Sequence, residues 1–220
     1  MIRAGILTVV AAVWALPASA SGGAHVVDDA AVEIVGTCHL ESWVSRTGRR
    51  AVLVNSAPAC TFRILPRIEF GGALQREWLR GEDARTLAGP SIKLLLTAPS
   101  HGPSLALVGT AAIDTRSGAI ATASVIAPVT FTLSGRTRLN LNAGWTRTGR
   151  HDAAFYGAQI EHAVTETLAV MVEAYRLGGA NGVQSGLRWT PKPGRIDVDL
   201  LAARETGLPP RLTLGLTVRA

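Results

Sequence analysis

The sequence has few of the residues that fill a thick soluble core, and it has no second long apolar run. Aromatic residues make up 5% and charged residues 17% of the 220 positions, and only two cysteines are present. After the first apolar stretch, no segment approaches the roughly 18 apolar residues of a transmembrane helix. These scarcities argue against a helical membrane protein.

Signatures of catalysis, of cofactor binding and of nucleic-acid binding are also absent. Glycines fall at turns and inside apolar stretches, not in a phosphate-binding loop, and the formal charge of +6 is scattered along the chain. His162 and Ser185 share a parity but belong to expected strands that are not neighbours. We therefore expect no enzyme, no cofactor, no metal site and no nucleic-acid partner. The chain has five histidines, and none shows a convincing pairing with a nucleophilic serine: His25, His39, His101, His151 and His162.

The N-terminus has the organisation of a secretory signal. A short positive region, Met1–Arg3, precedes an apolar run from Gly5 to Leu16, and Ala18-Ser-Ala20 matches a small-residue cleavage site. The alternative, a buried helix or a membrane anchor, is less favoured because the run is too short to span a bilayer. Residues 1–20 are thus predicted to be a signal peptide, and the chain to be exported.

The segment that follows, residues 21–35, is rich in small residues and acidic at Asp28, Asp29 and Glu33. A flexible leader, an additional strand and a plug all agree with this composition. The rest of the chain, residues 36–220, is expected to form one domain.

Apolar and polar residues alternate through most of that domain. In Arg138–Thr146 the apolar positions are Leu139, Leu141, Ala143 and Trp145, and Asn140, Asn142, Gly144 and Thr146 lie between them. Residues 183–189, 196–200 and 212–218 repeat the pattern. A period of two places all apolar side chains on one face of a strand. Counting such stretches gives about twelve strands, within a range of 10–14, joined by short turns.

Two all-β architectures agree with this alternation: a soluble exported β-sandwich and a membrane barrel. Nearly every expected strand has an apolar face, yet many of its residues are small, such as Ala143, Ala158 and Ala202. Small residues fill a core poorly but are acceptable against lipid. The sequence therefore favours a closed, antiparallel, up-and-down transmembrane β-barrel.

The two cysteines lie on either side of an expected hairpin. If Cys38–Arg46 and Ala51–Cys60 pair around a turn centred on Arg49, then Cys38 faces Cys60 directly. Directly opposed residues of antiparallel strands are within disulfide range, and an exported chain meets an oxidising compartment. We predict a Cys38–Cys60 disulfide; two unpaired thiols are the alternative.

The next stretch, Arg63–Glu77, is expected to be a long strand with a bulge at Pro66, since proline cannot donate to a ladder. Residues 78–87 are expected to form the longest loop, with a helical turn as one option.

The alternating strands and the signal resemble the small outer-membrane β-barrels of Gram-negative bacteria over roughly Cys38–Ala220. The resemblance implies an outer-membrane location, contact with lipid, and insertion by the barrel assembly machinery. The chain departs from the family in ending on Ala220 instead of Phe or Trp. Its aromatic girdle is thin, with Trp78, Trp145, Tyr156 and Trp189 as interface residues. The stretch Leu40-Glu-Ser-Trp43 is similar to outer-membrane transport proteins associated with aromatic-compound degradation.

In such a barrel the polar parity faces the lumen. The expected function is a narrow channel or porin-like transporter for small solutes, and the alternative is a structural or surface-interaction barrel with a blocked lumen. Opposite charges inside could line a wet path or pair across and close it. The predicted lumen-lining residues are Arg63, Arg67, Glu69, Lys93, Arg138, Asn140, Asn142, Glu161, Glu173, Arg188, Asp197 and Asp199.

Overall fold

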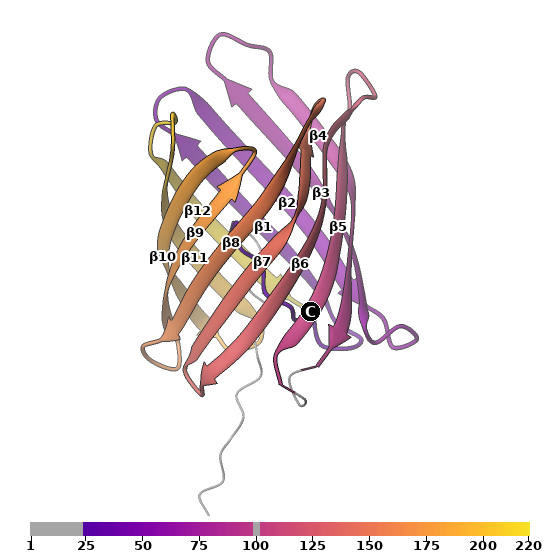
Figure 1. Cartoon of the computed structure of the whole chain (residues 1–220), viewed down its shortest axis with the longest axis vertical. Helices are drawn as coiled ribbons and strands as arrows, with labels where there is room; N and C mark the ends of the chain where they lie inside the picture. The colour runs from indigo at the N-terminus through magenta and orange to yellow at the C-terminus, as the bar shows by residue number, and fades with distance from the viewer. Residues whose placement is uncertain (1–23, 99–101) are drawn as a thin grey trace, which may run out of the picture.

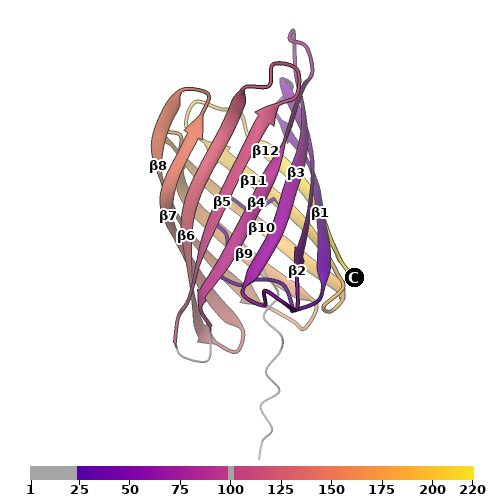
Figure 2. The same cartoon turned by 90° about the vertical axis from the view of Figure 1, so that its right-hand side faces the viewer.

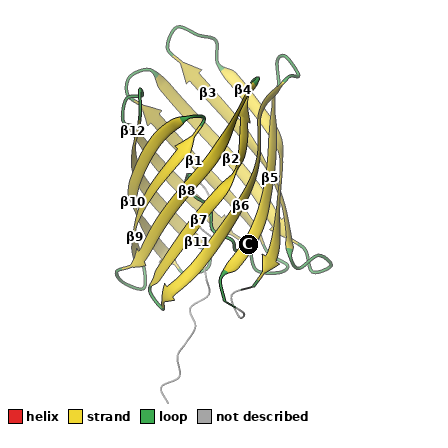
Figure 3. Cartoon of the chain, in the orientation of Figure 1, coloured by secondary structure: helices red, strands yellow, loops and turns green. Residues whose placement is uncertain are grey.

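A computed structural model describes residues 24–98 and 102–220, so the predicted signal peptide lies outside the described residues. The described chain forms a closed barrel of twelve strands (Figure 1; Figure 3). The strands are β1 (Cys38–Thr47), β2 (Ala51–Thr61), β3 (Ile68–Leu79), β4 (Arg85–Thr97), β5 (Ser104–Asp114), β6 (Ile120–Ser134), β7 (Thr137–Thr148), β8 (His151–Ala163), β9 (Leu168–Leu177), β10 (Ala180–Lys192), β11 (Ile196–Glu205) and β12 (Arg211–Arg219).

Every strand pairs with its neighbours in sequence, and β12 closes the barrel by pairing antiparallel with β1. At the end of this seam Cys38 and Ala220 exchange two backbone hydrogen bonds, of 3.2 and 2.9 Å. The predicted up-and-down barrel of about twelve strands is therefore confirmed. No helix among the residues that the structure describes is long and apolar enough to cross a membrane.

The two faces of the wall differ as the alternation predicts. On β12, Leu212, Leu214 and Leu216 are exposed on the outside, whereas Thr213 and Thr217 between them are buried inside. On β7, Leu141 is 39% exposed and Asn140 is fully buried. The barrel thus has an apolar exterior and a polar interior, which is the arrangement of a barrel surrounded by lipid.

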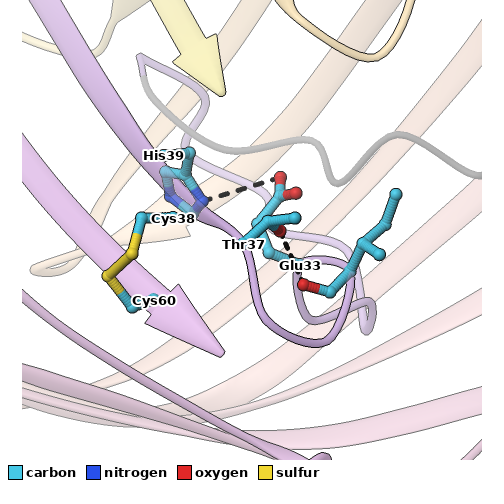
Figure 4. Close-up of a disulfide and its surroundings, with 6 residues drawn as sticks. Glu33, Thr37, Cys38, His39 and Cys60 are labelled. Carbon is cyan, nitrogen blue, oxygen red and sulfur yellow. Dashed lines mark hydrogen bonds and ion pairs between the residues drawn. A yellow bond between two sulfur atoms is a disulfide. The ribbon is translucent and has the colours of Figure 1, made fainter. Parts of the chain in front are cut away.

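The first hairpin has the predicted register, with Cys38 opposite Cys60, Ser42 opposite Ser56 and Val44 opposite Val54. Cys38 and Cys60 form a disulfide with Sγ atoms 2.04 Å apart (Figure 4). The predicted bridge is confirmed, and it links β1 to β2 at the end of the barrel where the seam ends.

Two expectations for the next segment are wrong. The strand begins at Ile68, not at Arg63, because Phe62–Arg67 forms the turn between β2 and β3. Backbone bonds from Leu65 to Phe62 and from Ile68 to Leu65 close this turn, and Pro66 lies in it, so no bulge is needed. The expected loop at 78–87 is also shorter, since β3 runs to Leu79 and β4 starts at Arg85.

The connections at both ends of the barrel are short (Figure 2). At the end opposite Cys38 and Ala220, called here the far end, strands are separated by residues 48–50, 80–84, 115–119, 149–150, 178–179 and 206–210. Gly48, Gly81, Gly149 and Gly207 adopt positive φ in these turns, which favours glycine. The connections at the far end are therefore all short, and none of them forms a large loop.

Candidate functional site: a polar lumen with an inner segment

The residues that precede β1 lie inside the barrel. Val27, Asp29 and Ala30 are fully buried, and the indigo chain of Figure 1 lies within the ring of strands. Residues 24–35 form no strand. We call residues 24–33 the inner segment. The inner segment thus lies within the barrel without joining its sheet.

Wall side chains bind the backbone of the inner segment. Because this segment has no strand partner, its buried N–H groups need acceptors from elsewhere. Five of them donate to side-chain oxygens of the wall: Val26 (2.9 Å) and Val27 (3.2 Å) to Glu173, Asp28 (2.8 Å) to Asn142, Ala30 (2.9 Å) to Thr130, and Glu33 (2.8 Å) to Glu69. The wall therefore holds the path of the chain largely independently of its side chains.

His25 anchors the N-terminal part of the inner segment. Its Nδ1 lies 2.5 Å from Glu173 Oε1, and its Nε2 lies 3.6 Å from Asp199 Oδ2. Burial alone would lower the pKa of His25, but the contacts with Asp199 and Glu173 more than offset it and raise the pKa to about 9. His25 is therefore a cation at neutral pH. Asp199 also accepts two hydrogen bonds from Arg188, at 2.8 and 2.9 Å.

Asp28 and Asp29 anchor the middle of the segment. Lys93 Nζ on β4 lies 3.1 Å from Asp28 and 3.4 Å from Asp29. Burial raises the pKa of Asp28 to about 6, although Lys93 acts in the opposite direction. On the other side Arg138 Nη1 lies 3.6 Å from Asp29. These ion pairs connect the segment to β4 and β7, which are separated by two strands of the wall.

Glu33 anchors the C-terminal part of the inner segment, close to the disulfide. It accepts a hydrogen bond of 2.7 Å from Arg219 on β12, and its carboxylate lies 3.6 Å from His39 Nδ1 (Figure 4). Arg219 also contacts Asp197 at 2.6 Å. The inner segment is thus tied to the wall beside the seam before the chain enters β1.

One apolar contact fixes the position of the inner segment along the barrel axis. Val27 packs in a buried cluster with Phe155 and Tyr175. Gly157 faces the same valine: a Cβ added to Gly157 would lie 2.6 Å from Val27 Cγ2. A glycine is required at this position because the inner segment approaches the wall closely.

Two cavities remain beside the inner segment. The larger, of about 690 Å³, extends from Ala24, His25 and Val26 toward the far-end residues Thr47 and Thr148. The smaller, of about 250 Å³, lies against the inner faces of β1–β6. Four residues border both cavities, so the two adjoin: His25, Thr110, Ser124 and Ile126. Together they extend from the far end to the side of the inner segment.

Comparison with known proteins relates this architecture to a family. A family model described as "Uncharacterised conserved protein UCP029691" matches residues 9–220. The chain belongs to this family. No curated protein matches the sequence.

Solved structures of similar shape are outer-membrane porins and channels. A structure titled "KdgM porin" has a TM-score of 0.66 at 5% identity and covers 82% of this chain and 98% of its own. A KdgM porin in complex with disordered oligogalacturonate has a TM-score of 0.63 at 6% identity, covering 83% and 98%. The COG4313 outer membrane channel from Pseudomonas putida F1 has a TM-score of 0.62 at 11% identity, covering 88% and 98%. The fold confirms the resemblance to small outer-membrane β-barrels.

Most of the predicted lumen residues lie on the inside of the wall. These are Glu69, Lys93, Arg138, Asn140, Asn142, Glu161, Glu173, Arg188, Asp197 and Asp199. Arg63 and Arg67 do not, because they belong to the exposed turn between β2 and β3. Within the described ranges 24–98 and 102–220, no group of three or more His, Cys, Asp or Glu residues is placed to hold a metal ion.

Several residues of the lumen were missed from the sequence. Glu41 shares the parity of His39 and Trp43 within β1, so alternation alone could have assigned it to the interior. Gln159 and Gln184, which both donate to Glu173, could have been found in the same way. His25 carries no such signal, because its contact with Glu173 joins residues 148 positions apart.

Proposed function

We propose that this protein is a porin-like channel of the Gram-negative outer membrane, through which small solutes pass beside the inner segment. One observation carries the proposal: a closed barrel with an apolar exterior contains two adjoining cavities that extend from the far end past His25. Twelve strands enclose more space than the eight of a barrel filled by its own side chains. The inner segment narrows that space, so the solutes are small.

The same proposal includes the lipid around the barrel, the insertion of the chain and the absence of catalysis. Lipid covers the apolar exterior, and the barrel assembly machinery inserts the chain. Passage along the wall requires no reacting group, so the protein acts as a transporter and not as an enzyme. The lining of the larger cavity combines hydroxyls such as Thr47, Thr146 and Thr148 with the aromatic rings of Trp43 and Phe155. Charged side chains, among them His25, Glu77 and Arg211, border the same cavity.

A barrel with a blocked lumen is the second candidate, and one observation favours it. The inner segment is bound by backbone hydrogen bonds and buried ion pairs along most of its length, as expected of a permanent plug. A role in surface recognition is disfavoured, because the connections at the far end are short. The two candidates differ in whether the space beside the inner segment is continuous enough for ions.

Conductance of single molecules distinguishes the two. We expect the purified mature protein to give small, steady current steps in planar lipid bilayers, and a variant lacking residues 24–33 to give larger steps. A silent mature protein together with a conducting deletion variant would establish the blocked barrel. Silence of both proteins would also overturn the channel.

The location is tested separately. A folded outer-membrane barrel resists mild SDS and shifts in gel mobility on boiling, and it remains with the envelope until detergent is added. Recovery as a soluble periplasmic protein would contradict the proposed location and the channel together.

A further inference from the structure

We propose that the passage prefers cations, and that Glu41 and Glu69 are the residues that give it this preference. The inference rests on the proposed channel and specifies the class of solute: small cations, and solutes that carry a positive charge. It is based on the charges around the smaller of the two cavities, which lies beside the inner segment.

Glu41 is a buried carboxylate that borders the cavity. The residue is 9% exposed, and neither carboxylate oxygen has a hydrogen-bond partner in the described part of the chain. The closest basic group is His39, whose Nε2 lies 3.7 Å from Oε1. A cation that enters the cavity favours the ionised form of Glu41, whose carboxylate then offers it about four lone-pair sites.

Glu69 adds a second carboxylate to the same cavity. Its Oε2 accepts one hydrogen bond, of 2.8 Å, from the backbone N–H of Glu33. Asp28 supplies a third carboxylate. Opposite them stands Lys93, whose ammonium contacts both Asp28 and Asp29 and is therefore largely neutralised. His25, which also borders the cavity, is held by Glu173 and Asp199. Asp28 and Lys93 balance each other, so the carboxylates of Glu41 and Glu69 give the cavity more negative than positive charge.

The arginines of the lumen do not reverse this balance. Arg211, which borders the larger cavity, contacts Glu205 at 2.7 Å. Arg188 is bound by both oxygens of Asp199, Arg138 contacts Glu161 at 2.7 Å, and Arg219 lies between Glu33 and Asp197. All three lie on β7–β12 and do not border the smaller cavity. A positive charge held by a carboxylate contributes little field at a distance, whereas low-dielectric walls strengthen the field of the carboxylates left in the cavity.

The preference is opposite to the charge of the whole chain. The formal charge is +6, yet exposed arginines in turns, such as Arg49, Arg50, Arg63 and Arg67, contribute much of the positive charge. These side chains are exposed to solvent in turns at the ends of the barrel, where salt screens their charge. The net charge therefore does not determine the selectivity.

Reversal potentials in a KCl gradient test the inference. We expect potassium to permeate at least about fivefold better than chloride, the ratio that one carboxylate about 4 Å from an ion in water provides. Glu41→Gln keeps the size and hydrogen-bonding capacity of the side chain and removes its charge, so the ratio should fall severalfold. Glu166→Gln removes the same charge from an exposed turn and should leave the ratio unchanged.

The outcomes separate this inference from the channel itself. Absence of conductance contradicts the proposed function. Conductance with a preference for chloride overturns the inference and leaves the channel intact. If Glu41→Gln fails to give the heat-modifiable folded form, Glu69→Gln replaces it. A ratio that neither substitution changes would show that these carboxylates do not set the selectivity.

Discussion

The two halves of the barrel wall have similar outer faces and different inner faces. On β7–β12 the interior is crowded with buried amides and charges, among them Asn142, Gln159 and Glu173, which bind the inner segment. On β2–β6 many inner residues are small, such as Ala57, Ser91 and Ser124, and they border the smaller cavity. We call the first the binding wall and the second the open wall.

The difference shows how one alternating pattern can serve two purposes. Both walls have an apolar exterior, so both are compatible with contact with lipid. Inside, large polar groups on one wall satisfy the backbone of the inner segment, and small groups on the other leave room for the smaller cavity. Lys93, Glu69 and Thr130 are exceptions on the open wall, since all three bind the inner segment. An asymmetric lumen can therefore hold a segment and still contain a path.

The largest effect is expected from Glu173→Ala on the binding wall. The change removes the partner of His25 and the acceptor of two backbone N–H groups. Breaking a buried charge pair costs roughly 3–5 kcal/mol. The inner segment should leave its place, and a thiol introduced as Ala30→Cys should react with maleimide much faster. Both native cysteines are joined in the disulfide, so this thiol is the reactive one.

Thr110→Val on the open wall is the matched control. Thr110 bonds Ser124 at 2.7 Å and borders both cavities, so its loss should leave the labelling of Ala30→Cys slow. Equal labelling in the two variants would contradict the division into a binding and an open wall.

A second experiment tests whether the outer faces are equivalent. Leu141 of β7 and Leu107 of β5 are exposed to similar extents, 39% and 42%. A charge on the lipid side costs about 2–4 kcal/mol near the midplane. Leu141→Arg and Leu107→Arg should therefore lower the stability in lipid vesicles by similar amounts, measured by urea unfolding. Ser91→Arg, inside the open wall, should cost less, and the reverse order would invert the assignment of the faces.

A smaller effect is expected where the inner segment touches the wall. Gly157→Ala places a Cβ against Val27, and overpacking of this kind costs roughly 1–3 kcal/mol. The segment should shift, and the conductance should rise while the barrel remains heat-modifiable. Ala57→Val enlarges a residue that borders the smaller cavity and should lower the conductance instead. If both substitutions changed the conductance in the same direction, the two walls would contact the inner segment alike.

The smallest effect is expected from pH, because deprotonation removes one charge and leaves the other contacts in place. The pKa of His25 is raised to about 9 when the segment is bound, above its ordinary 6.5. Its stabilising contribution is therefore complete below pH 6.5 and is lost as the pH rises through 9. A nitroxide attached at Ile34→Cys should become more mobile between pH 7 and pH 10.

Two controls define the pH effect. His25→Gln should remove the pH dependence of the nitroxide, because glutamine does not titrate. Asp28 does not contribute in this range, because its raised pKa of about 6 lies below pH 7. An unchanged spectrum from pH 7 to pH 10 in the native segment would show that the charge of His25 does not hold it.

Much of the fold could be predicted from local pattern. The alternation in β12 follows from lipid outside and water inside, and the disulfide follows from counting paired positions around one turn. The start of β3 could not be predicted this way. Arg63–Arg67 alternates by chance, and the chain needs these residues to reverse direction between β2 and β3.

The site could be predicted only in part. Parity assigns Asn142 and Glu173 to the interior, because closing the barrel does not change which way a side chain points. The position of the inner segment depends on contacts that exist only after closure. His25 meets Glu173 from β9 and Asp199 from β11, and nothing near His25 in the sequence indicates either partner.

The position of the disulfide has a consequence for assembly. β1 pairs with β2 on one side and with the final strand on the other, so an error in its alignment would be passed to the closing seam. A slip of one residue would turn His39 and Glu41 toward lipid and Leu40 toward water. The Cys38–Cys60 bond permits only the alignment in which these two residues face each other. An oxidised first hairpin therefore offers β12 a strand whose register with β2 is already fixed.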